Sequence, residues 1–179
     1  MPAPVIPVPG RTCGDCAMCC KLGAIKEVNK PDGQWCKHCS SHSKCDVYAL
    51  RPDVCKVYHC HFLLSDLDES WRPSRCHLMV SALPNNLVYI SVDADHPHAW
   101  QTEPYFSYIR GWANNHRVVV LVGSQIYAVY PDRIDDLGML HTGHALTFTL
   151  EETAMGTIQR TIMVNGDLNI LPVVGVPRR

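Results

Sequence analysis

The cysteines of this chain are confined to its first half. Of the ten cysteines in 179 residues, nine lie between Cys13 and Cys60, the tenth is Cys76, and residues 77–179 contain none. A general packing preference for cysteine would not sort the residues in this way, so the first third of the chain carries cysteine chemistry of its own. The chain as a whole is 46 % hydrophobic and 18 % charged, which is enough apolar sequence to build a core.

The N-terminal sequence and the overall charge indicate the compartment of the protein and the class of its partners. The chain begins Met-Pro-Ala-Pro-Val-Ile-Pro-Val-Pro-Gly, without the early basic residue or the unbroken apolar stretch of a secretory signal. No window approaches the ~20 apolar residues that span a bilayer. We therefore expect a cytoplasmic protein with no membrane segment, in a compartment where clustered thiols bind metals more often than they form disulfides. The net charge of −1 does not favour nucleic acid as a partner, and a protein partner is left open.

Composition divides the chain into four segments. Residues 1–11 form a Pro-rich arm, and residues 12–62 a cysteine-cluster metal-binding module that contains all six lysines. A linking segment covers residues 63–76, and a β-rich scaffold region covers residues 77–179.

Hydrophobic periodicity beyond residue 77 predicts strands and one helix. Strands are expected at 87–92, 146–150 and 157–164, the last followed by an Asn165-Gly166 turn, and as a hairpin of 118–122 with 126–130. Apolar residues spaced along 104–114, after a proline, predict an amphipathic helix. The predicted fold class is α+β: a small cysteine-rich metal-binding module packed on a mainly antiparallel β-sheet with one helix.

The first cysteine cluster reads Cys13-x-x-Cys16-x-x-Cys19-Cys20. Two successive Cys-x-x-Cys steps curl the chain so that three thiolates surround one concavity, as an iron–sulfur cluster requires. Because adjacent side chains diverge, Cys20 either serves a second metal or replaces Cys19 as the third ligand.

The remaining cysteines of the module are more widely spaced. They are Cys36, Cys39, Cys45, Cys55 and Cys60. Soft thiolate ligands favour zinc, iron–sulfur clusters or copper(I) over magnesium or calcium. We expect the cations Lys44, Arg51 and Lys56 to offset the negative charge of such sites.

Residues 12–62 resemble the bacterial CxxCxxCC cysteine-cluster family, whose members are described as zinc- or iron-chelating domain proteins. The resemblance rests on the CxxCxxCC run and on Cys45-x2-Tyr48-x2-Arg51-Pro52-x2-Cys55-x4-Cys60. It implies eight metal-ligating cysteines: Cys13, Cys16, Cys19, Cys20, Cys36, Cys45, Cys55 and Cys60. Members of the family have been called iron–sulfur oxidoreductases, and a similar motif occurs in flagellin lysine N-methylase.

We therefore expect an intracellular metal-binding protein that holds an iron–sulfur cluster, with [4Fe–4S] favoured, or zinc. Its role would be in redox chemistry or as an accessory in protein modification, and neither a reaction nor a catalytic residue is identified. The crowding of three ligands into seven residues favours iron–sulfur, whereas eight thiolates divide evenly into two four-ligand zinc sites. The alternative is a structural zinc module that serves protein or nucleic-acid binding without catalysis.

Several further residues have two interpretations. Cys39 is either a ninth ligand or a small buried hydrophobic residue, while Cys76 is expected to be a packed thiol. His59 and His61 flank Cys60 and could ligate the metal or donate a hydrogen bond to sulfur. The other paired histidines are interpreted as solvated loop residues: His96, His98, His141 and His144.

Overall fold

The first part of the chain folds into short helices and turns, as the computed structural model shows. The structure describes residues 6–83, 86–139, 147–152, 158–164 and 167–171. The helices are α1 (Cys19–Leu22), α2 (Asp53–Val57), α3 (His61–Leu64), α4 (Pro73–Cys76) and α5 (Tyr105–Trp112). Single 3-10 turns span Lys26–Val28, Tyr48–Leu50, Glu69–Trp71 and Ala99–Gln101.

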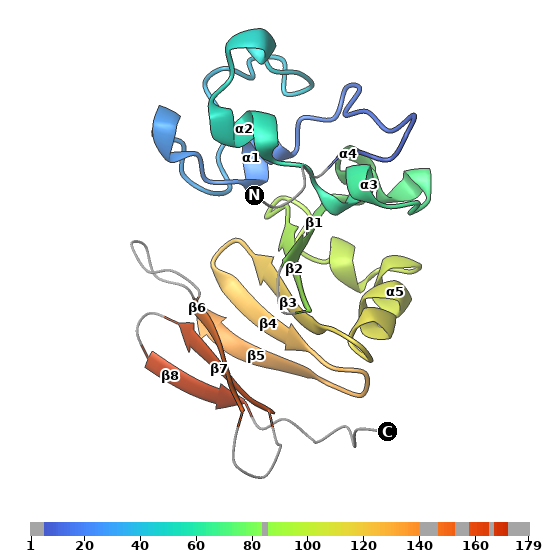
Figure 1. Cartoon of the computed structure of the whole chain (residues 1–179), viewed down its shortest axis with the longest axis vertical. Helices are drawn as coiled ribbons and strands as arrows, with labels where there is room; N and C mark the ends of the chain where they lie inside the picture. The colour runs from blue at the N-terminus through green and yellow to red at the C-terminus, as the bar shows by residue number, and fades with distance from the viewer. Residues whose placement is uncertain (1–5, 84–85, 140–146, 153–157, 165–166, 172–179) are drawn as a thin grey trace.

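A five-stranded sheet forms the centre of the described structure (Figure 1). Its strands are β1 (Leu78–Leu83), β2 (Leu87–Val92), β3 (Arg117–Val122), β4 (Gln125–Val129) and β5 (Ile134–Met139), adjacent in that order. The β1–β2, β3–β4 and β4–β5 pairs are antiparallel, whereas β2 and β3 are parallel. The α+β class is therefore confirmed, with a mixed sheet. The parallel pair needs a crossover connection, which the segment containing α5 supplies.

The predicted elements of this sheet agree closely with the observed ones. The strand expected at 87–92 is β2, and the expected hairpin is β3–β4, with Gly123 at φ +58° in its turn. The expected helix is α5, which begins directly after Pro104. Strand β5 was not predicted, because its sequence Ile-Asp-Asp-Leu-Gly-Met lacks a β-branched run.

A second, three-stranded antiparallel sheet follows in the chain. It consists of β6 (Thr147–Glu152), β7 (Ile158–Val164) and β8 (Asp167–Leu171). The strands predicted at 146–150 and 157–164 correspond to β6 and β7, while β8 was not predicted. The predicted Asn165-Gly166 turn and the histidines at 141 and 144 lie outside the described residues.

The main core lies on one face of the five-stranded sheet. Along β2, Val88, Ile90 and Val92 join this core, whereas Leu87 belongs to a smaller cluster on the opposite face. This alternation is the period-two pattern of a strand buried on both faces. The main core also includes residues that precede the sheet: Phe62, Leu63, Trp71 and Cys76. The segment expected to link two regions therefore supplies core side chains.

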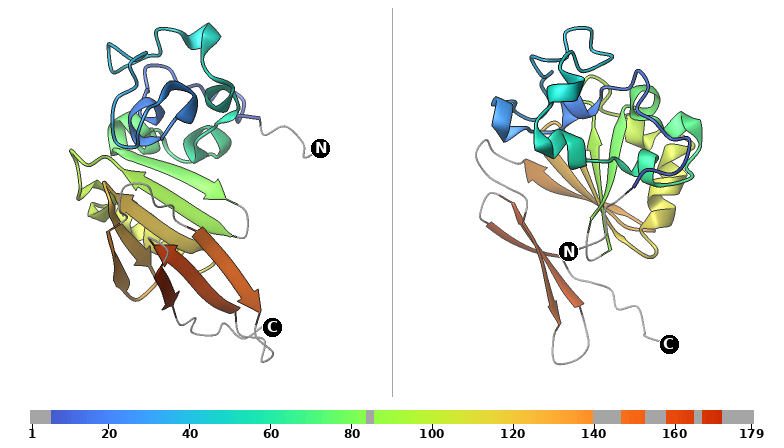
Figure 2. Two further views of the ribbon diagram at one scale, coloured as in Figure 1. Left: turned by 90° about the vertical axis from the view of Figure 1, so that its left-hand side faces the viewer. Right: turned by 45° about the horizontal axis from the view of Figure 1, so that its top comes forward.

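The cysteine-bearing residues 12–62 lie at one end of the five-stranded sheet (Figures 1 and 2). They are attached to the sheet by contacts between α3 and β1 and by a 3.0 Å hydrogen bond between the hydroxyls of Tyr58 and Ser81. The N-terminal arm packs beside them, where the Val8 N–H donates to the Leu63 carbonyl at 2.8 Å. None of the helices in the described part of the chain has the length and apolar character that a membrane crossing requires.

Candidate functional site

Four cysteines from distant parts of the sequence line one small cavity. We call Cys13, Cys16, Cys19 and Cys60 the first cysteine group. The cavity has a volume of about 40 Å³, and its other lining residues are Tyr58, Phe62, Leu63, Arg72, Pro73 and Met79. Mostly apolar side chains therefore surround these thiols, with one arginine among them.

Local turns bring the first three thiols of this group together. The Cys16 N–H donates to the Cys13 carbonyl at 2.9 Å, which closes the first Cys-x-x-Cys step into a turn. Gly14 adopts φ +55° within that turn, a left-handed conformation that favours glycine. Cys19 is the first residue of α1, and Cys60 directly precedes α3.

Burial and charge act in opposite directions on the thiols of the first cysteine group. Burial, with the neighbouring Cys16 thiolate, raises the pKa of the Cys13 thiol, and the positive charges of Arg51 and Arg72 oppose that rise. Burial also raises the pKa of Cys60. Arg72 is anchored over the turn, because its guanidinium donates to the carbonyls of Thr12 and Cys13 at 3.0 and 2.7 Å. A negatively charged cofactor bound here would have a cation already in place.

The other cysteines of the region gather around Cys20. The second cysteine group comprises Cys20, Cys36, Cys39, Cys45 and Cys55. Cys20 and the buried Cys36 and Cys39 pack in one cluster, and burial together with the charges of Cys20, Cys36 and Cys45 raises the pKa of Cys55. Residue Cys39 is 1 % exposed, and burial with the Cys20 charge raises the pKa of its thiol to about 12.

Backbone hydrogen bonds hold this second group together. The Cys39 N–H donates to the Cys36 carbonyl at 3.0 Å, the same turn as in the first Cys-x-x-Cys step. The Cys36 N–H donates to the Cys20 carbonyl at 2.8 Å, which ties this loop to α1. The structure therefore places Cys39 beside Cys20 and Cys36, although the resemblance to the cysteine-cluster family gives Cys39 no role.

The adjacent residues Cys19 and Cys20 belong to different groups but remain in contact. Cys19 lines the cavity, whereas Cys20 packs with Cys36 and Cys39. The hydrogen bond that the Cys20 thiol donates to Cys19 is the largest influence that raises the pKa of Cys20. Trp35 packs against the cluster that contains Cys36 and Cys39, and also against a second cluster that Cys16 and Cys60 border. The two groups are therefore neighbours that share a boundary at the start of α1.

The sulfur atoms are not drawn together as a single bound ion would draw them. All ten cysteines lie in the described ranges, all are free thiols, and no three of their sulfurs lie within 4.8 Å of one another. Tetrahedral zinc with Zn–S bonds of about 2.3 Å separates its sulfurs by only about 3.8 Å. Either cysteine group would therefore have to draw its sulfurs closer together to hold one zinc ion.

The Tyr48-x-x-Arg51-Pro52 motif forms a turn between Cys45 and Cys55. The Arg51 guanidinium stacks over the Tyr48 ring at 3.8 Å and donates to the Tyr48 and Cys55 carbonyls at 2.7 and 3.2 Å. Pro52 directly precedes α2, which carries Cys55. Arg51 therefore orders this turn, and its positive charge also opposes the rise in the pKa of Cys13.

The other expected cations act elsewhere. Lys56 pairs with Asp53 at 2.8 Å on the surface, and the Lys44 charge acts on Asp46. Two further cations, Arg72 and Lys30, were not predicted, and their charges act on the first and second cysteine groups respectively. Lys30 is buried and donates to the Lys21 and Pro31 carbonyls at 2.8 and 2.9 Å.

Cys76 and the histidines near Cys60 have packing roles in this structure. Cys76 is buried in the main core, where its Sγ lies 3.4 Å from the Trp71 and Leu78 carbonyl oxygens, so the packed-thiol prediction is confirmed. His61 packs edge-on against Trp112, and burial lowers its pKa. His59 lies 3.1 Å from the Val57 carbonyl.

One group of ligand-type residues was not predicted from the sequence. His77, Asp93 and His96 have ligand atoms within 4.8 Å of one another. The interpretation of His96 as a solvated loop residue is incomplete, because its ring stacks on His77 at a centroid distance of 3.5 Å. An Asp-x-x-His step after a predicted strand was the available signal, but the partner His77 is remote in sequence.

Comparisons of this chain with known protein families, curated proteins and solved structures gave no match. The resemblance of residues 12–62 to the cysteine-cluster family therefore stays a prediction from the motif alone.

Proposed function

We propose that the protein binds metal through the cysteines of residues 12–62, with an iron–sulfur cluster as the favoured cofactor and zinc as the other candidate. The observation that carries the proposal is the cavity shared by Cys13, Cys16, Cys19 and Cys60. Cysteines with no disulfide partner that converge from distant positions on one cavity are typical of metal sites.

The spacing of the cysteines and the lining of the cavity favour an iron–sulfur cluster at the first cysteine group. Three of its four cysteines, Cys13, Cys16 and Cys19, lie in two successive Cys-x-x-Cys steps, a spacing that recurs in iron–sulfur sites. Phe62, Leu63 and Met79 limit the access of water, and Arg72 supplies positive charge beside the thiolates. Both features affect the reduction potential of iron–sulfur clusters. Such a cluster would supply one-electron transfer, consistent with a redox or accessory role.

A separate observation favours zinc at the second cysteine group. Cys20 lies within hydrogen-bonding reach of the Cys39 thiol, so at least one pair of sulfurs is close together there. Five cysteines surround this position, one more than a closed tetrahedral site needs. We infer that Cys39 is a ligand of the second cysteine group and that one other member is dispensable for metal retention.

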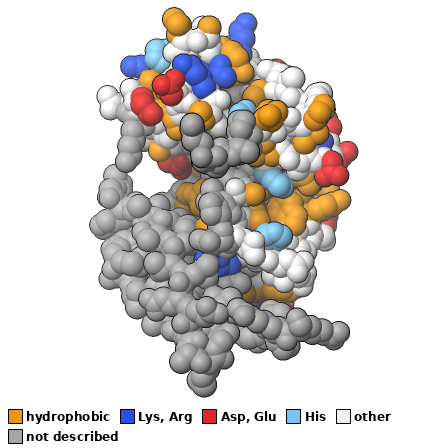
Figure 3. Space-filling view, viewed as in Figure 1, with side chains coloured by type: hydrophobic (Ala, Val, Ile, Leu, Met, Phe, Trp, Pro, Cys, Tyr) orange, Lys and Arg blue, Asp and Glu red, His pale blue; other side chains and the backbone are white. Residues whose placement is uncertain are grey.

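The alternative function is a structural zinc module that binds a protein partner. Large apolar side chains are exposed in the segment that joins the cysteines of the second group: Tyr48, Leu50, Val54 and Val57. Basic and acidic side chains lie side by side over this end of the molecule, and no single-sign surface is apparent on the face that Figure 3 shows. This face therefore suits a protein partner better than nucleic acid.

Cysteine substitution in protein isolated without oxygen tests the proposal. Cys13→Ser is expected to remove the metal of the first cysteine group, seen as a loss of iron, sulfide and visible absorbance. Cys76→Ser is the matched control, because Cys76 is buried but lies outside both groups, and it should retain the full metal content. Equal metal content in Cys13→Ser and the wild type would contradict the proposal.

Reduction separates the two cofactors. A cluster at the first cysteine group should lose visible absorbance on reduction with dithionite and regain it on reoxidation. Colourless protein with two equivalents of zinc, unchanged by dithionite, would instead support the structural zinc module.

A further inference from the structure

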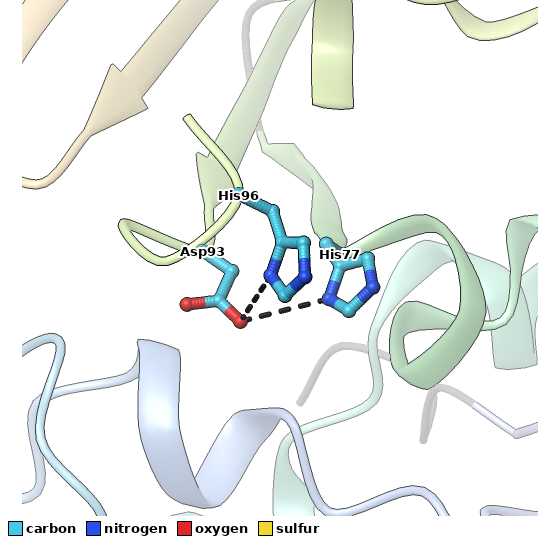
Figure 4. Close-up of side chains that lie close together, drawn as sticks. All are labelled: His77, Asp93 and His96. Atoms are coloured by element: carbon cyan, nitrogen blue, oxygen red, sulfur yellow. Dashed lines mark ion pairs between the residues drawn. The ribbon is translucent and has the colours of Figure 1, made fainter. Parts of the chain in front are cut away.

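Two histidines and an aspartate meet at one edge of the five-stranded sheet, outside both cysteine groups. The Nδ1 atoms of His77 and His96 lie 3.6 and 3.5 Å from Oδ2 of Asp93 (Figure 4). Two imidazoles and a carboxylate are the ligand set that zinc and non-haem iron(II) sites use.

The backbone fixes the positions of all three residues. His77 and Asp93 flank the antiparallel pair β1–β2, and the Asp93 N–H extends the ladder by donating to the His77 carbonyl at 3.0 Å. A tight turn follows, in which the His96 N–H donates to the Asp93 carbonyl at 2.8 Å. His77 adopts φ +60°, an unusual conformation for a residue other than glycine, and so turns out of α4 directly into β1. The three side chains converge because of the strand register.

The two oxygens of Asp93 have different surroundings. Oδ1 accepts from the Lys21 ammonium at 2.5 Å and from the Asp95 N–H at 3.1 Å. In the part of the chain that the structure describes, Oδ2 faces the two imidazoles, at distances longer than a normal hydrogen bond. Among the described residues, the buried Nδ1 of His77 has no hydrogen-bond partner. Oδ2 of Asp93 and Nδ1 of His77 therefore face each other without a hydrogen bond between them.

The charge balance also favours a cation. Lys21 contacts both Asp93 and Asp95, at 2.5 and 2.6 Å, so one ammonium faces two carboxylates. With both histidines neutral, this cluster carries a net charge of −1. The side chain of Asp93 is 5 % exposed, whereas those of His77 and His96 are 30 % and 50 % exposed. The Asp93 carboxylate of this site is thus buried, whereas solvent reaches the two imidazoles.

We propose that His77, Asp93 and His96 bind one divalent transition-metal ion, of the zinc or iron(II) kind, through the two Nδ1 atoms and Oδ2. Three protein ligands leave at least one coordination position for water or a small ligand. The imidazole rings are stacked with an interplanar angle of 16°, so ion binding must rotate them apart until each ring plane points at the ion. The backbone bonds of the site need not change. The site takes no ligand from the cysteines and is independent of the function proposed for them.

Zinc binding to the full-length protein as isolated tests this site. His96→Ala is the variant of choice, because His96 is half exposed and its loss leaves no cavity in the core. His98→Ala is the matched control, since His98 lies in the same loop and faces Gln101 instead of the site. At micromolar Zn²⁺, the wild type and His98→Ala should each take up one more equivalent than His96→Ala, whose affinity at this site should fall at least tenfold.

A spectroscopic measurement locates the ion without relying on the variant. In nuclear magnetic resonance spectra, the ring nitrogens of His77 and His96 should shift on addition of Zn²⁺, and those of His98 should not. Equal zinc uptake by the wild type and His96→Ala, or unshifted His77 and His96 resonances at saturating Zn²⁺, would overturn the proposal. Cysteine substitutions that remove the metal of the cysteine groups should leave the difference in zinc uptake between the wild type and His96→Ala unchanged. Failure of the histidine-site proposal is therefore distinguishable from failure of the cysteine-site proposal.

Discussion

The cysteine-bearing segment and the five-stranded sheet are held together by different means. In the sheet, β2, β3 and β4 are lined with buried Val, Leu and Ile side chains on both faces. In the cysteine-bearing segment, no residue from 40 to 61 is buried, and Leu50 and Val57 are 85 % and 72 % exposed. Apolar burial therefore accounts for the sheet but not for this segment, so another interaction must define its conformation.

Removal of the metal should have the largest effect, because it should act on the cysteine-bearing segment and not on the five-stranded sheet. Metal binding contributes roughly 10–16 kcal/mol to the folding of small zinc modules, so stripping the metal should unfold residues 12–62 and leave the sheet folded. In hydrogen-exchange measurements with and without a chelator, amides of residues 40–61 should lose protection, whereas those of β2 and β3 should keep it. Equal protection of both regions in the two states would contradict the proposed role of the metal.

Lys21→Met should produce the next largest effect, because Lys21 joins the two regions. Its ammonium contacts Asp93 at 2.5 Å, and both side chains are less than a tenth exposed. The substitution leaves the Asp93 carboxylate buried without its ammonium partner, which should lower the free energy of unfolding by about 3–5 kcal/mol. Urea denaturation measures the change.

The matched control is Lys56→Met, whose pair with Asp53 is exposed. That substitution should cost no more than about 1 kcal/mol. If the two variants lose the same stability, the Lys21 pair is no stronger than a surface pair.

Truncation of apolar side chains should lower the free energy of unfolding by a similar or smaller amount. It distinguishes the five-stranded sheet from the cysteine-bearing segment directly. Ile90 is fully buried in β2, so Ile90→Ala should lower the free energy of unfolding by about 2–5 kcal/mol. Leu50→Ala, in the exposed segment, should change it by no more than about 0.5 kcal/mol. Thermal unfolding of the two variants provides the comparison. A large loss of stability in Leu50→Ala would show that apolar contacts hold the cysteine-bearing segment after all.

Acidification should produce the smallest effect near neutral pH. Burial opposes ionisation of Asp93, but the Lys21 ammonium and the Asp95 N–H outweigh it and lower the pKa of Asp93 below 3.8. Stability from this carboxylate is therefore complete above pH 3.8 and is lost as the pH falls through the folded-state pKa. The stability difference between the wild type and Lys21→Met should be largest near neutral pH and shrink as the pH falls, because in the variant burial is no longer opposed by the ammonium and raises the pKa of Asp93.

Urea denaturation at each pH measures this difference. The other titratable groups that face the pair are His77, His96 and Asp95. A stability difference that stays the same from pH 7 to pH 3 would contradict the role of the Asp93 carboxylate.

Local patterns in the sequence were sufficient to predict much of the sheet. The β-branched run of 87–92 predicts β2, and Pro104 with the spaced apolar residues after it predicts α5. Strand β5 was missed because its two aspartates and a glycine resemble a turn, and only its pairing with β4 makes it a strand. The parallel pairing of β2 and β3 depends on the path of the chain through α5, which periodicity does not report.

The candidate sites were predictable only where their residues are close in sequence. Cys13, Cys16 and Cys19 form a local motif, so their convergence could be expected. Arg72 and Lys30 could not be assigned to the cysteines, because the fold alone brings them there. Lys21 and Asp93 are separated by 72 positions, and His77 meets Asp93 only through the β1–β2 register. Contacts of this kind depend on the tertiary structure.

The central claim is that thiolates of residues 12–62 hold a metal, and the metal and thiol content of the wild-type protein tests it most directly. Iron, zinc and acid-labile sulfide should be measured in protein isolated without oxygen, together with the free thiols released on denaturation. We expect bound iron with sulfide, or bound zinc, and ten free thiols after the metal is removed. Protein without iron or zinc, with its cysteines joined in disulfides, would contradict the claim.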